Sequence, residues 1–160
     1  MALVMVATAA CSKKDDGDDT IVTEEYVDLG LTSGTKWKNV NEKNSADTEH
    51  GFYDYNTALN TFGTKMPNKD QWIELDDECT WTWNGSGYRV VGPNGKSISL
   101  PALGFRDCNG NVATVGTSGY YWSFTYSGAN GAWFLGFNEN GTEVNTCDRC
   151  AGYAVRLVQK

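Results

Sequence analysis

The chain has 160 residues, of which 40% are hydrophobic, and a formal net charge of −7 at pH 7. A chain of this length fits one domain with a single core. The acidic balance argues against nucleic acid as a partner, because phosphate binding needs a basic surface that 13 lysines and arginines, scattered along the chain, do not supply.

The first residues match the pattern of a bacterial lipoprotein signal. An apolar stretch over residues 3–10 precedes Cys11, and a polar, acidic stretch follows it. A signal peptidase needs small side chains beside the cleavage point, and a cysteine after that point supplies the thiolate that accepts a diacylglyceryl group. We interpret residues 1–10 as a signal remnant and Cys11 as the lipidated N-terminus. The stretch lacks a basic start and is short for a signal, which favours Met1 as an internal methionine of a longer precursor; a frayed terminus with a chance cysteine is the alternative.

Residues 11–25 are predicted to be a flexible acidic tether, because a stretch rich in Asp and Gly without apolar periodicity cannot bury enough surface to become ordered. Seven of the 20 acidic residues lie between Cys11 and Leu29, against two lysines, so the formal net charge of the rest is −2. An acidic stretch after a lipidated cysteine resembles the export signal of Bacteroidetes surface lipoproteins; a solubilising linker is the alternative. We expect a lipid anchor in the outer membrane, with the protein exposed on the cell surface.

The domain is predicted to span residues 26–160 and to begin with a strand over 26–31 and a polar loop over 41–49. Asp54 is placed to cap a short helix that Gly63 ends.

A second helix follows. Asn68 and Gln71 have the spacing of a capping box, in which each side chain accepts a hydrogen bond from the other residue's backbone amide. Trp72, Leu75 and Cys79 then fall on one helical face, so this helix is expected to lie on a sheet.

The sequence after Cys79 is predicted to form hairpins. Short alternating stretches separated by Gly, Asn and Pro turns predict strands over 80–83, 88–91, 97–100, 120–125, 132–137 and 152–158. The predicted fold class is therefore α+β, with two short helices followed by a twisted antiparallel sheet of hairpins.

Five blocks of sequence resemble the Fibrobacter succinogenes major paralogous domain, in the order of that family: YVDLGLTSGTKW over 26–37, KMPNKDQW over 65–72, LPALGFR over 100–106, GYYWS over 119–123 and GYAVRLV over 152–158. The resemblance implies a surface or secreted protein of Bacteroidetes or Fibrobacteres. It also implies a C-type lectin-like fold, of the variant shared with formylglycine-generating enzymes.

Four cysteines remain beyond Cys11, and an even number in an exported protein suggests disulfides with three connectivities. Cys108 and Cys147 both lie in C-terminal loops, and we favour that pair, which leaves Cys79 and Cys150. Reduced thiols are the alternative. Structural zinc is disfavoured, because Cys147-x-x-Cys150 is only half of a four-cysteine pattern, and no metal is expected.

An oxidase is the enzymatic alternative. Formylglycine-generating enzymes use two cysteines before a C-terminal strand with an arginine, and here Cys147 and Cys150 precede Arg156; two thiolates can hold a copper ion. The spacing is shorter and the domain smaller than in that family, so we expect no catalysis and no cofactor. His50 is interpreted as a solvated loop residue, and the acidic run over 74–78 as a solvent-exposed helix face.

Binding is the favoured class of function, with a glycan or a protein on a partner surface as ligand; a structural surface protein without a ligand is the alternative. Loops on a rigid frame carry most recognition, Asn and Asp bond hydroxyl groups, and Trp and Tyr stack on flat apolar faces. The candidate contacts are Asn109, Asn111, Tyr126, Asn130, Trp133, Asn138, Asn140, Asn145 and Asp148.

Overall fold

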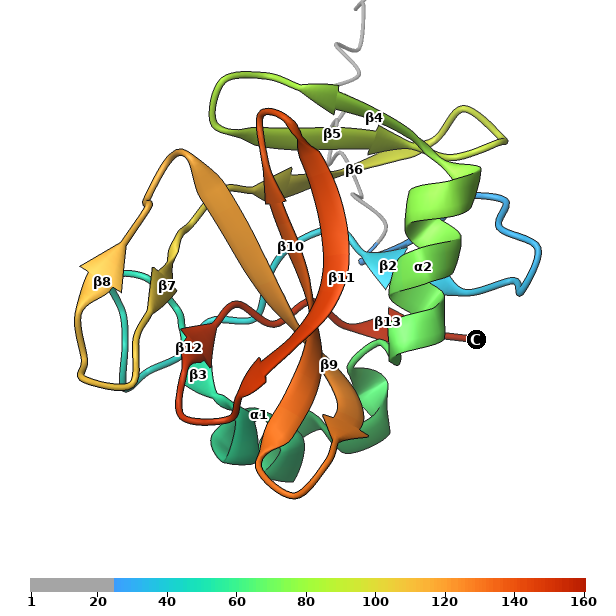
Figure 1. The fold of residues 1–160 in the computed structure, drawn as a ribbon. Helices are drawn as coiled ribbons and strands as arrows, with labels where there is room; N and C mark the ends of the chain where they lie inside the picture. Colours follow the sequence, from blue (N-terminus) through green and yellow to red (C-terminus); the bar gives the residue numbers. More distant parts are fainter. Residues whose placement is uncertain (1–24) are drawn as a thin grey trace, which may run out of the picture.

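Short antiparallel strands dominate the computed structural model, which describes residues 25–160 (Figure 1). In chain order the elements are β1 (Tyr26–Asp28), β2 (Lys36–Lys38), β3 (Tyr53–Asp54), α1 (Tyr55–Phe62), the 3-10 helix η1 (Gly63–Lys65), α2 (Lys69–Glu78), β4 (Thr80–Trp83), β5 (Gly87–Val91), β6 (Ser97–Pro101), β7 (Phe105–Arg106), β8 (Val112–Ala113), β9 (Ser118–Ser127), β10 (Gly131–Asn138), β11 (Gly141–Asp148), β12 (Gly152–Tyr153) and β13 (Val158–Gln159). Cys11 and all of the predicted tether except Glu25 lie outside the described residues.

The prediction of an α+β, C-type lectin-like fold is wrong, because strands make up 44% of the described residues and helices about 15%. Three strands precede the helices, and β11 was not predicted at all. Strands of two or three residues are too short to show periodicity, and β11 is largely exposed, so its sequence reads as a loop. No helix in the described part of the chain is long and apolar enough to cross a membrane.

The strands form four small sheets, with the orders β1-β2-β13, β3-β12-β7-β8, β4-β5-β6 and β11-β10-β9. The first of these joins the two ends of the domain, because β13 pairs with β2, which also pairs with β1. The second sheet likewise brings β12, from the end of the domain, beside β3.

The helix signals in the sequence are confirmed. The Asp54 carboxylate accepts from the amide of Thr57 at 3.0 Å, and Gly63 ends α1 with a positive φ of 51°. Asn68 and Gln71 form both hydrogen bonds of the capping box, at 2.7 and 2.9 Å.

The acidic run of α2 is not simply a solvent-exposed face, because two of its carboxylates are hydrogen-bonded to the rest of the chain. Glu74 accepts hydrogen bonds from the amide and the hydroxyl of Ser33, at 2.7 and 2.6 Å, and Glu78 accepts from the amide of Thr32 at 2.9 Å. Through these carboxylates α2 holds the turn between β1 and β2.

The hairpin β9–β10 lies at the centre of the core and is buried on both faces. Tyr121 and Leu135 belong to one apolar cluster, with Trp72 of α2, whereas Trp122 and Phe134 belong to the other. Adjacent residues of a strand point to opposite faces, so this alternation of large side chains places one cluster on each side of the hairpin.

The predicted strand over 152–158 is broken in two. After β12, Ala154 exchanges hydrogen bonds with β9, accepting from Trp122 and donating to Tyr120, both at 3.0 Å. Arg156 then turns inward and is 1% exposed. Its guanidinium donates to Asn41 Oδ1 at 2.7 Å, to the Lys38 carbonyl at 2.8 Å and to the Ser99 carbonyl at 2.7 Å.

Replacement of Arg156 by Lys is expected to lower the free energy of unfolding by about 2–4 kcal/mol, because one ammonium cannot reach all three acceptors and leaves buried oxygens unpaired. Urea denaturation measures this loss. Arg89→Lys, at an exposed position of β5, is the matched control and should change the value by less than about 0.5 kcal/mol. Equal stability of the two variants would contradict the role assigned to Arg156.

Candidate functional site

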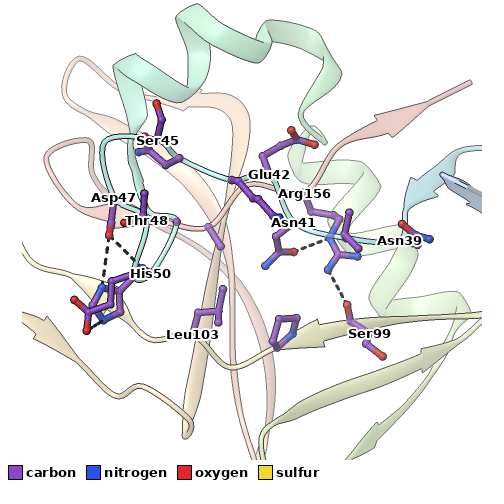
Figure 2. A pocket seen from close by; sticks show the side chains of 17 residues that line it. Asn39, Asn41, Glu42, Ser45, Asp47, Thr48, His50, Ser99, Leu103 and Arg156 are labelled. Atoms are coloured by element: carbon purple, nitrogen blue, oxygen red, sulfur yellow. Dashed lines mark hydrogen bonds and ion pairs between the residues drawn. The ribbon is translucent and has the colours of Figure 1, made fainter.

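A groove of about 740 Å³ lies beside the loop between β2 and β3 (Figure 2). One wall is the loop between β2 and β3, through residues 39–45 and 47–51. The opposite side consists of Ser99, Pro101, Leu103, Ala154 and Arg156. Within it Pro101, Leu103 and Ala154 form an aliphatic surface, called the floor below, and the loop surrounds this floor with polar side chains.

Asn41 and Glu42 anchor the first half of the loop. The Asn41 amide donates to the Tyr121 hydroxyl at 3.1 Å and accepts from Arg156 on its oxygen. Glu42 donates its backbone amide to the Val155 carbonyl at 2.9 Å, and its carboxylate lies 2.6 Å from Lys38 Nζ. Burial of the Tyr121 ring raises the pKa of its hydroxyl to about 12, so this group stays protonated at neutral pH.

Asp47 anchors the second half of the loop. Its carboxylate accepts from the amides of His50 and Phe52, both at 3.2 Å, and from the Arg106 guanidinium at 2.6 Å. Burial alone would raise the pKa of Asp47, but these hydrogen bonds and the Arg106 charge outweigh it and hold the pKa below its ordinary value.

His50 lies in the groove wall rather than free in solvent. Its side chain is 18% exposed and stacks on Phe52, with the ring centroids 5.2 Å apart. The Nδ1 atom is 3.6 Å from the Asp47 carboxylate. His50 does lie in a loop, as interpreted, but most of its side chain is covered, since the hydrogen bonds to Asp47 fold this end of the loop inward.

One edge of β6 faces the groove. Gly92 donates its amide to the Lys96 carbonyl at 2.9 Å, so these two residues form a hydrogen-bonded pair. Such pairs alternate along antiparallel strands, so in the register of β5 and β6 the N–H and C=O groups of Ser99 point away from β5. The Ser99 and Pro101 carbonyls on this edge accept from Arg156 and from the Tyr121 hydroxyl. The groove thus combines an aliphatic floor, a polar rim and part of a strand edge.

The structure distributes the nine candidate contact residues over four places. Tyr126, Asn130, Trp133 and Asp148 lie at or near the end of the sheet where β9 and β10 are joined, and Asn138 and Asn140 lie at the turn between β10 and β11. Asn109 and Asn111 lie in the loop between β7 and β8, and Asn145 lies on the exposed strand β11. None of them lines the groove.

Asn130 and Asp148 share an open polar cleft of about 450 Å³ with Asp54, Asn56 and Arg149. The neighbouring Tyr126 ring is 53% exposed and carries the Arg149 guanidinium at 5.5 Å from its centroid. Trp133 instead carries the Lys69 ammonium of α2, at 5.0 Å. The two aromatic candidates therefore already have cationic partners.

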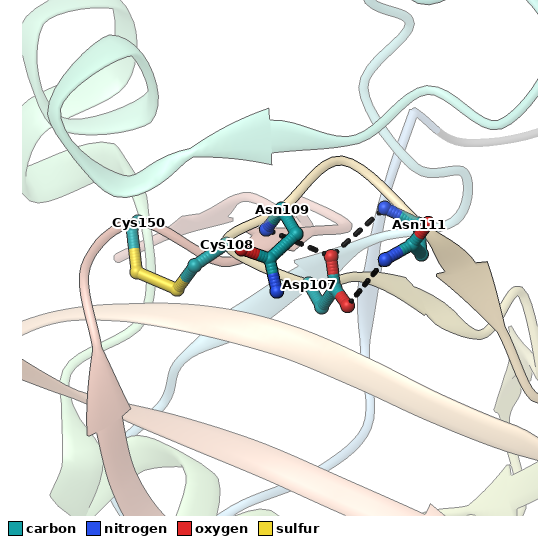
Figure 3. The surroundings of a disulfide bond; sticks show 5 residues. All are labelled: Asp107, Cys108, Asn109, Asn111 and Cys150. Atoms are coloured by element: carbon teal, nitrogen blue, oxygen red, sulfur yellow. Dashed lines mark hydrogen bonds between the residues drawn. A yellow bond between two sulfur atoms is a disulfide. The ribbon is translucent and has the colours of Figure 1, made fainter.

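Two of the remaining amides are used within their own segments. Asn111 donates its side-chain amide to Asp107 at 3.0 Å (Figure 3). Asn145 donates to Glu143 at 3.3 Å and accepts from the amide of Thr146 at 2.8 Å.

A disulfide is confirmed, but the favoured pairing of Cys108 with Cys147 is wrong. Cys108 is bonded to Cys150, across 42 residues of sequence (Figure 3). Cys79 and Cys147 are free and half-buried. Cys147 lies on β11, and its half-buried side chain packs against the apolar cluster that includes Tyr153. The copper alternative needs thiolates at both Cys147 and Cys150, and the disulfide occupies the second of them.

Over residues 25–160, no group of three or more His, Cys, Asp or Glu side chains is arranged to hold a metal ion. Comparisons with protein-family models, with curated proteins and with solved structures found no match to this chain. The function must therefore be argued from the geometry of the chain itself.

The sequence interpretation missed the groove, although one signal pointed to it. Arg156 is a single charge within the apolar run over 151–158, and a buried charge of this kind must find acceptors elsewhere in the fold. Which loop supplies those acceptors depends on tertiary packing, and the loop over 39–51 shows no apolar pattern of its own.

Replacement of Asp47 by Asn is expected to lower the free energy of unfolding at pH 7 by about 1–3 kcal/mol, because the carboxylate accepts several hydrogen bonds. A lowered pKa in the folded state stabilises the fold above the pKa of the unfolded chain, about 3.9, and this contribution is lost as the pH falls through the folded value. Urea denaturation at pH 7 and pH 3 should therefore show the difference between the wild type and the variant shrinking at the lower pH. Asp77→Asn, at an exposed position of α2, is the control and should show neither effect.

Both free thiols are expected to react slowly in the native protein. Burial raises the pKa of Cys79 and of Cys147 to about 11, so little thiolate is present at pH 8. Alkylation with iodoacetamide should be at least about tenfold slower than for an exposed cysteine, and the rate should still rise between pH 8 and pH 10. Mass spectrometry of the digest identifies each site; rapid native labelling of Cys147, or a labelled Cys150 without reduction, would contradict the geometry.

Proposed function

We propose that the chain is a surface-anchored, non-catalytic binding module whose groove takes an extended segment of a partner protein. The observation that carries this proposal is the groove itself, because an aliphatic floor lies beside a strand edge whose peptide groups point toward it. Cys11 and the acidic residues after it support a lipid anchor. The resemblance to a family of surface proteins supports the same location at the cell surface.

An extended peptide suits this geometry better than a sugar. Peptides that lie along a strand edge gain main-chain hydrogen bonds, and alternate side chains gain contact with an apolar surface. On that edge the Ser99 amide is the group that can donate to a peptide, because the Ser99 and Pro101 carbonyls already accept from Arg156 and Tyr121; Pro101, Leu103 and Ala154 offer aliphatic contacts. The described residues that line the groove include no Phe, Tyr or Trp on which a sugar ring could stack.

The loop is suited to binding because it is preorganised. Asn41, Glu42 and Asp47 hold it to β9, to the chain after β12 and to β7, through hydrogen bonds of 2.6–3.1 Å. A ligand that meets a fixed loop does not have to order it, so less of the contact energy is lost to conformational entropy. Val40, which is 56% exposed, adds an aliphatic side chain to the rim.

Peptide and glycan arrays probed with the Cys11→Ser chain test the ligand class. We expect binding to aliphatic, extended peptides, and Val40→Glu should weaken it about tenfold or more by placing a charge on the rim. Val115→Glu is the matched control, because Val115 is 55% exposed and does not line the groove. Glycan binding that Val40→Glu abolishes would show that the groove is a sugar site, and blank arrays would favour a structural surface protein.

The anchor has its own test. Palmitate labelling of the precursor expressed in a Bacteroides host is expected for the wild type and not for Cys11→Ala, since the thiol is the attachment point. Protease treatment of intact cells then measures surface exposure of the domain. Equal labelling of the two chains would exclude Cys11 as the lipidated residue.

A further inference from the structure

The Arg156 guanidinium is a buried cation in the wall of the groove. Arg156 lines the groove, although only 1% of the residue is exposed. It donates hydrogen bonds to the Asn41 side chain and to the carbonyls of Lys38 and Ser99, and all three acceptors are neutral. The Tyr121 hydroxyl, which is also neutral, is its other hydrogen-bonding neighbour. Within the described part of the chain, no carboxylate is therefore bonded to this cation.

The Glu42 carboxylate attracts this charge without a hydrogen bond to it, and it is already paired. It lies 2.6 Å from Lys38 Nζ, in an ion pair that cancels much of its field at longer range. Burial therefore outweighs the attraction and lowers the pKa of Arg156. An anion that a ligand brings into the groove would stabilise the buried guanidinium.

The buried cation lies at one end of the groove. Figure 2 shows Arg156 and Ser99 at this end and Asp47 and His50 at the other, with Leu103 between them in this view. The Asp47 carboxylate is already bonded to a guanidinium, at 2.6 Å. A ligand therefore meets the cation that lacks a bonded carboxylate at the Ser99 end, and the aliphatic floor beside it.

Free hydrogen-bond donors lie at the same end. Asn39 and Ser99 line the groove, and neither side chain has a hydrogen-bond partner among residues 25–160. The amide of Asn39 carries two N–H donors and the hydroxyl of Ser99 carries one O–H donor. An ionised carboxylate only accepts hydrogen bonds, so these donors suit it. The Ser99 end of the groove thus offers a carboxylate both hydrogen bonds and a positive charge.

We propose that the extended segment bound in the groove carries an Asp or Glu side chain at the Ser99 end and an aliphatic side chain two residues away. This inference rests on the peptide-binding role proposed for the groove. Residues two positions apart in an extended chain share a face, as Ser99 and Pro101 of β6 do. The acidic side chain then lies beside Asn39 and Ser99, and the aliphatic one lies on the floor.

The carboxylate does not have to touch the guanidinium to gain from it. Charges that are partly buried are screened much less than charges in water, so the attraction acts across the wall of the groove. The cation is also held in place before the ligand arrives, through its bonds to Lys38, Asn41 and Ser99. Such complementarity selects an acidic segment over a neutral or basic one.

Isothermal titration of the Cys11→Ser chain with peptides capped at both ends tests the inference. The peptides carry Glu-Ser-Leu or Leu-Ser-Glu at the centre, which covers both directions of binding, and each has a partner with Gln in place of Glu. We expect one order to bind about tenfold more tightly with Glu than with Gln.

The other outcomes separate this inference from the proposed function. Equal affinity of the Glu and Gln peptides, or tighter binding of the Gln form, would overturn the inference and leave the peptide-binding role standing. Tighter binding of an uncapped Gln peptide than of the capped Glu peptide would place a chain terminus at the Ser99 end and also overturn it. Absence of binding by every peptide at about 1 mM would overturn both.

Asn39→Asp is the diagnostic variant, because it supplies a carboxylate from the chain itself at the Ser99 end. The change keeps the size of the side chain and breaks no hydrogen bond of it, so the fold should be intact. The preference for Glu over Gln should fall from about tenfold to none, while the Gln peptide binds as before. Asn60→Asp, at an exposed position of α1 outside the groove, is the matched control and should keep the preference. An undiminished preference in Asn39→Asp would overturn the placement of the ligand carboxylate.

Discussion

The buried guanidinium of Arg156 is the interaction on which most of this structure depends. It is 1% exposed and joins the C-terminal part of the chain to two distant segments, through Lys38 at the end of β2 with Asn41 in the groove loop, and through Ser99 on β6. Desolvation lowers its pKa, and all three direct acceptors are neutral oxygens, so the charge is stabilised by hydrogen bonds rather than by an ion pair. Removing an acceptor would leave part of a buried cation unpaired, which explains why the groove loop is held so firmly to the rest of the domain.

Local signals in the sequence predicted the local structure well. The caps at Asp54 and Asn68 depend on residues within one turn of each helix, and both formed as expected. The failures involved long-range contacts. The exposed strand β11 is held by backbone pairing with β10 along its whole length. Backbone pairing does not require apolar alternation, so the sequence of β11 gives no sign of a strand.

The candidate site was harder to predict than the fold, for a physical reason. Asn in a turn can serve the backbone or a ligand, and the sequence does not distinguish the two; the structure shows Asn111 bonded to Asp107 and Asn140 with its side chain free. The disulfide posed the same difficulty. Cys147 and Cys150 differ by three positions, but β11 directs Cys147 into the core, so that Cys150 meets Cys108.

Neighbouring side chains of strand β9 serve opposite faces of the central sheet. The Tyr121 hydroxyl reaches the groove, where it bonds Pro101 and Asn41, whereas the Tyr120 ring packs on the other face against Phe105, Phe134 and Tyr153. Because adjacent residues point to opposite faces of the strand, one segment of backbone positions both. Its side chains pack into clusters on each face, and closely packed cores resist gradual deformation, so this part of the backbone is held rigidly. The two faces of this strand therefore belong to one rigid frame that positions the groove.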